Sequence, residues 1–234
     1  MSSPAPTVRC LSDRPVTRDD LTEAALPTEQ ARWRLERCTL DGEDLSGLAL
    51  DGAEFIDCSL RGTVLDRARL GGSHWQGCRA ASARFELADL TDARFEGCDL
   101  NNSSWARARL PGAAFTESKL TGARFTEALT LGLQLQACLL VSADLRGLSF
   151  RKQRLQGLRL NAADLSGCDF SDAVLIDCDL SDAHLKNARF TRADLRRAQL
   201  GTVQIGDLLQ HYKGCTLSVD QAATLVAGLG VEVV

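Results

Sequence analysis

The side chains best able to do chemistry are nine cysteines, three histidines and many aspartates. The cysteines form no CxxC pair, and no Cys/His spacing suits zinc. His74, His184 and His211 lie far apart in the sequence. Neither a nucleophile elbow nor a phosphate-binding glycine loop is present. These residues therefore predict no enzyme, no cofactor and no metal site. Six cysteines instead recur at position i+20 or at a multiple of that spacing: Cys38, Cys58, Cys78, Cys98, Cys138 and Cys178.

The cysteine spacing belongs to a five-residue period. Every fifth residue from Leu35 to Ile205 gives 35 positions, of which 30 are Leu or Phe, and all eight Phe of the chain fall among them. The residue two places earlier is Ala, Cys, Ser or Thr in 27 of these repeats. Neither a helix of 3.6 residues per turn nor a strand of period two can hold such a pattern on one face. The chain must turn a corner in every repeat, and 13 of the 19 glycines occupy one phase that suits a turn with φ > 0.

Runs such as Ala88-Asp89-Leu90 resemble the A(D/N)LXX motif of pentapeptide-repeat proteins, and the resemblance covers about residues 33–206. It implies four repeats per square coil. The expected fold is an all-β solenoid, a right-handed quadrilateral β-helix of nearly nine coils, with a short N-terminal helical cap and a C-terminal α-helix. Because four repeats of five complete one coil, positions i and i+20 stack, and the six cysteines should form an internal structural ladder.

The sequence predicts three regions: a tail and helical cap in 1–30, the β-helix in 31–206, and a helical cap and dimerisation element in 207–234. In the first, a helix is expected from Thr17 to Leu26, with Thr17 as its N-cap. In the last, Ser218 and Gln221 predict a capping box, Gly230 a C-terminal cap, and residues 231–234 a short strand.

The C-terminal segment has two interpretations. It is either a simple cap over the last coil or a cap that also dimerises with its twin. Residues 220–231 resemble the dimerisation element of topoisomerase-protecting pentapeptide proteins, the Qnr, MfpA and AlbG-like groups. This resemblance assigns a homodimer interface to the following apolar residues: Leu225, Val226, Leu229, Val231 and Val233.

The same resemblance implies a DNA mimic that binds DNA gyrase or topoisomerase IV, and modulates the enzyme or protects it from quinolone- or albicidin-like poisons. Qnr proteins carry projecting loops, whereas the unbroken phase here allows only insertions of a multiple of five residues. The alternative is a general protein-interaction scaffold with no topoisomerase role. A monomeric rather than a dimeric protein would favour that alternative.

Charged residues alternate in belts along the second half of the repeats. Residues 146–159 and 186–197 are mainly basic, whereas 164–182 contain six acids and no Lys or Arg. The belts are either solvated repeat positions or a surface complementary to a basic partner. The acidic belt consists of these residues: Asp164, Asp169, Asp172, Asp177, Asp179 and Asp182. A net charge of −4, without a basic patch interleaved with aromatics, predicts no direct binding of nucleic acid.

The chain has neither an apolar signal core nor an 18-residue apolar run, so we expect no membrane span and a cytoplasmic protein with reduced thiols.

One segment departs from the repeat. Thr130 replaces a large core residue, and Leu133, Leu148 and Leu158 replace small ones. These exchanges predict either a distorted coil, with a surface patch of Leu129, Leu131 and Leu139, or compensated core packing.

Overall fold

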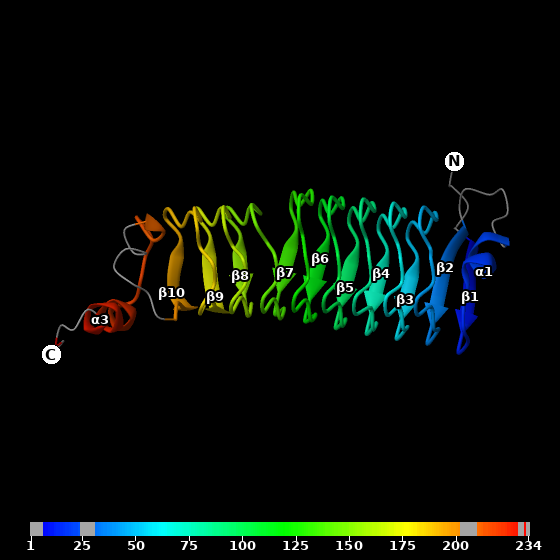
Figure 1. The fold of residues 1–234 in the computed structure, drawn as a ribbon, viewed down its shortest axis with the longest axis horizontal. Helices are drawn as coiled ribbons and strands as arrows, with labels where there is room; N and C mark the ends of the chain where they lie inside the picture. Colours follow the sequence, from blue (N-terminus) through cyan, green and yellow to red (C-terminus); the bar gives the residue numbers. More distant parts are fainter. Residues whose placement is uncertain (1–6, 24–30, 202–209, 229–231, 233–234) are drawn as a thin grey trace. The chain divides into compact units, whose positions relative to one another are not determined.

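The computed structural model describes residues 7–23, 31–201, 210–228 and 232 (Figure 1). The chain forms a parallel β-solenoid of about nine coils with a C-terminal helix, which confirms the predicted fold class. It divides into two compact units, residues 1–134 and 135–234. The first contains β1 (Thr7–Ser12), α1 (Arg18–Glu23), β2 (Ala31–Glu36), β3 (Glu54–Ile56), β4 (His74–Gln76), β5 (Arg94–Glu96) and β6 (Ala114–Thr116). β7 (Gln134–Gln136) begins at the boundary, and the second unit continues with β8 (Arg154–Gln156), β9 (Val174–Asp179), β10 (Asp194–Gln199) and α3 (Val219–Ala227).

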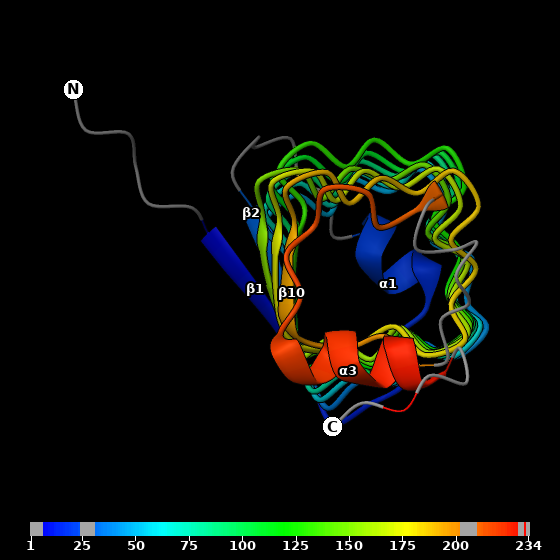
Figure 2. The same cartoon turned by 90° about the vertical axis from the view of Figure 1, so that its left-hand side faces the viewer.

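Each coil has four sides, and the chain returns to the same side at position i+20. On the side that carries the strands, Arg34 pairs in parallel with Glu54. Isolated parallel bridges on the other three sides also join positions i and i+20, such as Asp44 to Val64 and Ala49 to Arg69. Viewed along their axis, individual coils trace a four-sided outline (Figure 2). Four repeats of five per coil follow directly from this register.

A corner with left-handed backbone closes every repeat. From residue 37 to residue 192, every fifth residue has a φ between +51° and +74°, whether or not it is glycine. No Val, Ile or Thr occurs at this phase, because β-branched residues are strained in the left-handed region. The predicted turn position is therefore confirmed, and glycine is favoured there without being required.

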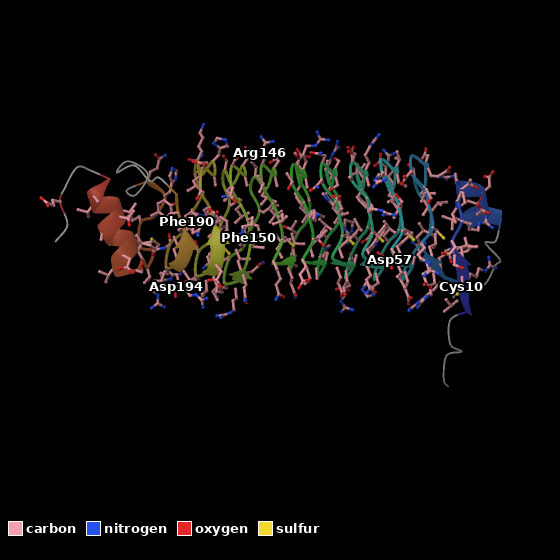
Figure 3. All side chains as sticks on the ribbon, turned by 90° about the horizontal axis from the view of Figure 1, so that it is seen from below. Cys10, Asp57, Arg146, Phe150, Phe190 and Asp194 are labelled. Atoms are coloured by element: carbon pink, nitrogen blue, oxygen red, sulfur yellow. The ribbon has the colours of Figure 1, made fainter. Side chains whose placement is uncertain are left out.

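Large apolar side chains fill the interior of each unit. In the first unit, Trp105 is fully buried and stacks on Phe85 with ring centroids 4.2 Å apart. Its indole N–H donates to the Ser103 hydroxyl at 2.7 Å, so that a serine at the small phase supplies the partner that a buried Trp needs. In the second unit, Phe150 and Phe190 belong to one inward column, whereas Arg146 and Asp194 project outward (Figure 3).

The N-terminal end of the first unit contains a strand that the sequence pattern did not indicate. β1 pairs in parallel with β2, and Leu11 aligns with Leu35 at i+24 rather than at i+20. α1 follows, and Leu21 and Val16 beside it are buried. Thr17 does not cap α1 with its side-chain oxygen as predicted. Instead, the carboxylate of Asp20 accepts from both the N–H and the hydroxyl of Thr17, because the longer acidic side chain reaches back to the helix start.

At the C-terminal end of the second unit, stacked residues are 22 rather than 20 positions apart. Tyr212 stacks on Phe190, with ring centroids 5.2 Å apart, and Thr216 pairs with Asp194. Ile205, the last predicted core position, lies outside the described residues. The helix α3 begins with the predicted capping box of Ser218 and Gln221. The prediction of Gly230 as its C-cap is wrong: Gly228, a poor helix former, already ends the helix.

The segment around Thr130 keeps its backbone register. The N–H of Leu110 donates to Leu129 O at 2.8 Å, and that of Gly112 to Leu131 O at 2.9 Å, so this side shows no bulge. The departure from the repeat shows instead in the side chains at the surface of the first unit. Leu129 and Leu131 are 54% and 84% exposed, and Thr130 is only partly buried. In the second unit, Leu139 is 39% exposed, and Leu148 and Leu158 are buried at the small phase.

Candidate interaction surfaces

The acidic belt lies on the outer surface of the second unit, and most of its carboxylates are paired with arginines. Asp169, Asp172 and Asp177 each form a salt bridge with the arginine at position i+20, at 3.1, 2.6 and 2.9 Å. Asp179 lies 4.0 Å from Arg159, one coil earlier, and Asp164 lies 3.6 Å from Arg146. The belt is therefore interlocked with both basic belts, because i and i+20 are nearest neighbours on adjacent coils.

Arginines cover the aspartates in this network. The side chains of Arg189 and Arg192 are 65% and 64% exposed, whereas those of Asp169 and Asp172 are 14% and 22% exposed. A short carboxylate stays near the backbone, and the longer guanidinium lies over it. Asp177 is the exception among the paired acids, with 57% of its side chain exposed. The accessible charge on most of the belt is thus the guanidinium and not the carboxylate.

The charge network also favours the ionised form of Asp172. A bidentate hydrogen bond from Arg192 holds the pKa of Asp172 below its ordinary value, and the charges of Arg151 and Lys152 lower that pKa further. The sequence indicated that basic and acidic belts alternate along the chain, but not that their side chains form salt bridges. The signal that would have revealed it is opposite charge at i and i+20, as in Asp169 and Arg189 or Asp172 and Arg192.

The helix α3 is attached to the last coil and leaves apolar side chains outside. The side-chain amide of Gln221 donates to Leu195 O at 2.8 Å and to Ala198 O at 2.7 Å. None of the residues in α3 is buried. Val219 is 85% and Val226 is 39% exposed, and Leu225 is half-buried. The other predicted interface residues, Leu229, Val231 and Val233, lie outside the described residues, as does most of the strand predicted for 231–234.

The cysteines of the predicted ladder are buried and carry free thiols. Within the first unit, the Sγ of Cys58 accepts from the N–H of Cys38 at 3.4 Å, and its thiol donates to Leu35 O at 3.3 Å. Cys138 and Cys178 are likewise buried in the second unit. Burial raises the pKa of Cys168, another inward thiol, to about 12. A buried thiol with a raised pKa is a poor nucleophile, which fits a packing role for Cys168.

Two wider features concern the part of the chain that the structure describes. No group of three or more His, Cys, Asp or Glu side chains there is placed to hold a metal ion. None of its helices combines the length and apolar character that crossing a membrane requires.

Comparison with protein families gives matches over most of the chain. The model of the pentapeptide repeat region matches residues 30–105 and 48–125, and that of pentapeptide repeats (8 copies) matches 134–172 and 168–203. No curated protein sequence matches.

Among solved structures, trypsin-treated QnrB1, described as a plasmid-mediated fluoroquinolone resistance protein, is 21% identical with a TM-score of 0.69. That match covers 99% of this chain and 100% of QnrB1. HetL of the cyanobacterium Nostoc sp. strain PCC 7120, involved in heterocyst differentiation regulation, is 24% identical, with a TM-score of 0.48 and coverage of 81% and 86%.

Proposed function

The chain belongs to the pentapeptide-repeat family, and on that premise we propose that it is a non-enzymatic binding protein for a type II topoisomerase, DNA gyrase or topoisomerase IV. In this proposal it occupies the site where DNA lies, and modulates the enzyme or protects it from quinolone- or albicidin-like poisons. The observation that carries the proposal is the likeness in fold to QnrB1, which extends over 99% of this chain. Identity is low, so the proposal concerns the class of partner and not a particular drug.

Charge on a regular backbone supports DNA mimicry as the mechanism. Adjacent coils lie about 4.8 Å apart, so outward side chains at i and i+20 repeat along a side at short, even steps, as Asp144 and Asp164 do in the second unit. In the second unit, carboxylates of the acidic belt already form salt bridges with arginines of adjacent coils. A basic partner must therefore exchange its own cations for residues such as Arg189 and Arg192. We propose that Asp177 and Asp182, the most accessible acids of the belt, are met first.

A homodimer through the C-terminal helix is part of the proposal. Its support is the exposed apolar pair Val219 and Val226 on a helix whose orientation Gln221 fixes by two hydrogen bonds. A second copy of α3 would cover these side chains. The proposed compartment is the cytoplasm, because the inward small phase uses seven thiols that a reducing environment keeps free.

A supercoiling assay with purified gyrase tests the function. We expect the protein at micromolar concentration to change supercoiling, or to restore it in the presence of a quinolone. Unchanged supercoiling and unchanged drug sensitivity, together with no binding to the enzyme, would sink the topoisomerase proposal. That outcome would favour the scaffold alternative, which the internal pairing of the acidic belt also supports.

A further inference from the structure

One side of the second unit gathers basic side chains, although the unit as a whole is balanced, with 11 Lys and Arg against 11 Asp and Glu. The aromatic rings of Phe150, Phe170, Phe190 and Tyr212 stack in a single column. Residues next to these rings in the sequence therefore project from one side. We call the following set of outward residues the basic side: Arg151, Lys152, Arg189, Arg192 and Lys213.

The register of the last coil places Lys213 in this set. The N–H of Arg192 donates to Gly214 O at 3.0 Å, so the residue before Gly214 lies beside Thr191. Two carboxylates, Asp169 and Asp172, share the side with the five cations. The basic side therefore has an excess of three positive charges, within a unit whose Lys and Arg equal its Asp and Glu in number.

The positive charge is the accessible part of this side. Arg151 is 52% exposed, and Arg189 and Arg192 are more exposed still, whereas both carboxylates are mostly covered. Lys152 and Lys213 are exposed and form no salt bridge with any residue that the structure describes. Asp172 shows how an anion sits here. It accepts two hydrogen bonds from Arg192, at 2.6 and 2.9 Å, and lies 3.6 Å from Arg151.

We propose that the basic side binds an acidic segment of a partner protein, with Asp or Glu side chains of the partner placed between Arg151, Lys152 and Lys213. Carboxylate is the ligand that these arginines already hold within the chain, in the bidentate geometry that guanidinium favours. Separate carboxylates on a peptide can fit between Asp169 and Asp172, whereas the continuous charge of a phosphate backbone would run across both.

Two observations favour a protein over nucleic acid as the occupant. The unit has no net positive charge to attract a polyanion from a distance. None of the exposed large hydrophobic side chains in the described residues is aromatic, so no stacking platform for bases accompanies the cations. This surface does not depend on the topoisomerase proposal, which concerns a basic partner and the acidic belt.

Fluorescence anisotropy at low salt tests the proposal, with a labelled 12-residue peptide in which Glu and Asp alternate with Gln and Ser. The test variant is Arg151→Gln/Lys152→Gln/Lys213→Gln. The matched control is Arg61→Gln/Arg79→Gln/Lys119→Gln, which removes from the first unit three exposed cations that form no salt bridge with any described residue. A neutral Gln/Ser peptide and a 12-base-pair duplex serve as competing probes. Circular dichroism of each variant verifies that the solenoid is folded.

The acidic peptide should bind the wild type, and the test variant should bind it about tenfold more weakly, as expected for three exposed charge pairs. The control should bind like the wild type, and the neutral peptide should not bind. Equal weakening in both triple variants would show general charge attraction and overturn the proposal. Tighter binding of the duplex than of the peptide, or no binding of the peptide at all, would overturn it as well.

Discussion

The corner of each coil must accommodate the side chain of the coil before it, and the Gly112→Ala substitution tests this. Gly112 has a φ of +67°, and a Cβ built there would lie 2.3 Å from Oδ1 of Asp92. Atoms cannot approach so closely, so the Asp92 carboxylate must rotate away. Gly42 provides the matched control, because its φ is +72° and a Cβ there would meet no atom within 4 Å.

The two variants separate backbone strain from the contact between coils. An L-residue in the left-handed region costs about 1 kcal/mol relative to glycine, and this applies to both sites. Moving the exposed Asp92 carboxylate to another rotamer costs about 0.5 kcal/mol more, because the tip of a flexible side chain can rotate away. The free energy of unfolding should therefore fall by about 1.5 kcal/mol in Gly112→Ala and by about 1 kcal/mol in Gly42→Ala.

Urea unfolding measures both losses, and a double-mutant cycle with Asp92→Ala isolates the contact. In the cycle, Gly112→Ala should cost about 0.5 kcal/mol less when Asp92→Ala removes the carboxylate. Equal losses at Gly112 and Gly42, with no coupling to Asp92, would refute the idea that Gly112 leaves space for the Asp92 side chain in addition to favouring the positive φ.

Three further predictions concern charge, assembly and thiols. Because Arg192, Arg151 and Lys152 lower the pKa of Asp172, its stabilising effect is present above about pH 4 and is lost as pH falls through the lowered value. The Tm of Asp172→Asn should accordingly fall less between about pH 5 and about pH 2 than that of the wild type, and equal slopes would argue against the pairing. Light scattering should give the wild type a mass of about twice 25.3 kDa and the folded Leu225→Glu/Val226→Glu variant the single mass; a monomeric wild type would remove the dimer. A thiol reagent should modify only exposed Cys10 and half-buried Cys215 in the native protein, and fast reaction of any further thiol would contradict the buried ladder.

The repeat could be read from the sequence wherever its spacing is constant. Leu and Phe at every fifth position, with a small residue two places earlier, determine both the side that faces inward and the stacking of position i on i+20. The same reading misses β1, because Leu11 aligns with Leu35 at i+24. It also misses Tyr212, which continues the Phe190 column two positions beyond the regular spacing. Changes in spacing occur at the ends, where caps and shifted turns replace whole repeats.

The candidate surfaces were less predictable than the core. The sequence shows that Asp172 and Arg192 stand at i and i+20, and hence are neighbours. It does not show that Arg192 lies over Asp172 and leaves the cation accessible, because that depends on the lengths and rotamers of two side chains. Burial in the core follows from a repeated backbone, whereas the outer surface depends on each side chain separately.

Competition for gyrase between this protein and a DNA duplex tests the central proposal most directly. Labelled duplex bound to purified gyrase would be titrated with the wild-type protein, and anisotropy of the duplex would be followed. A protein that occupies the DNA site should displace the duplex completely, at a midpoint that rises in proportion to the concentration of duplex. Simultaneous binding of both, or a duplex that stays bound at saturating protein, would contradict the proposal that the solenoid takes the place of DNA.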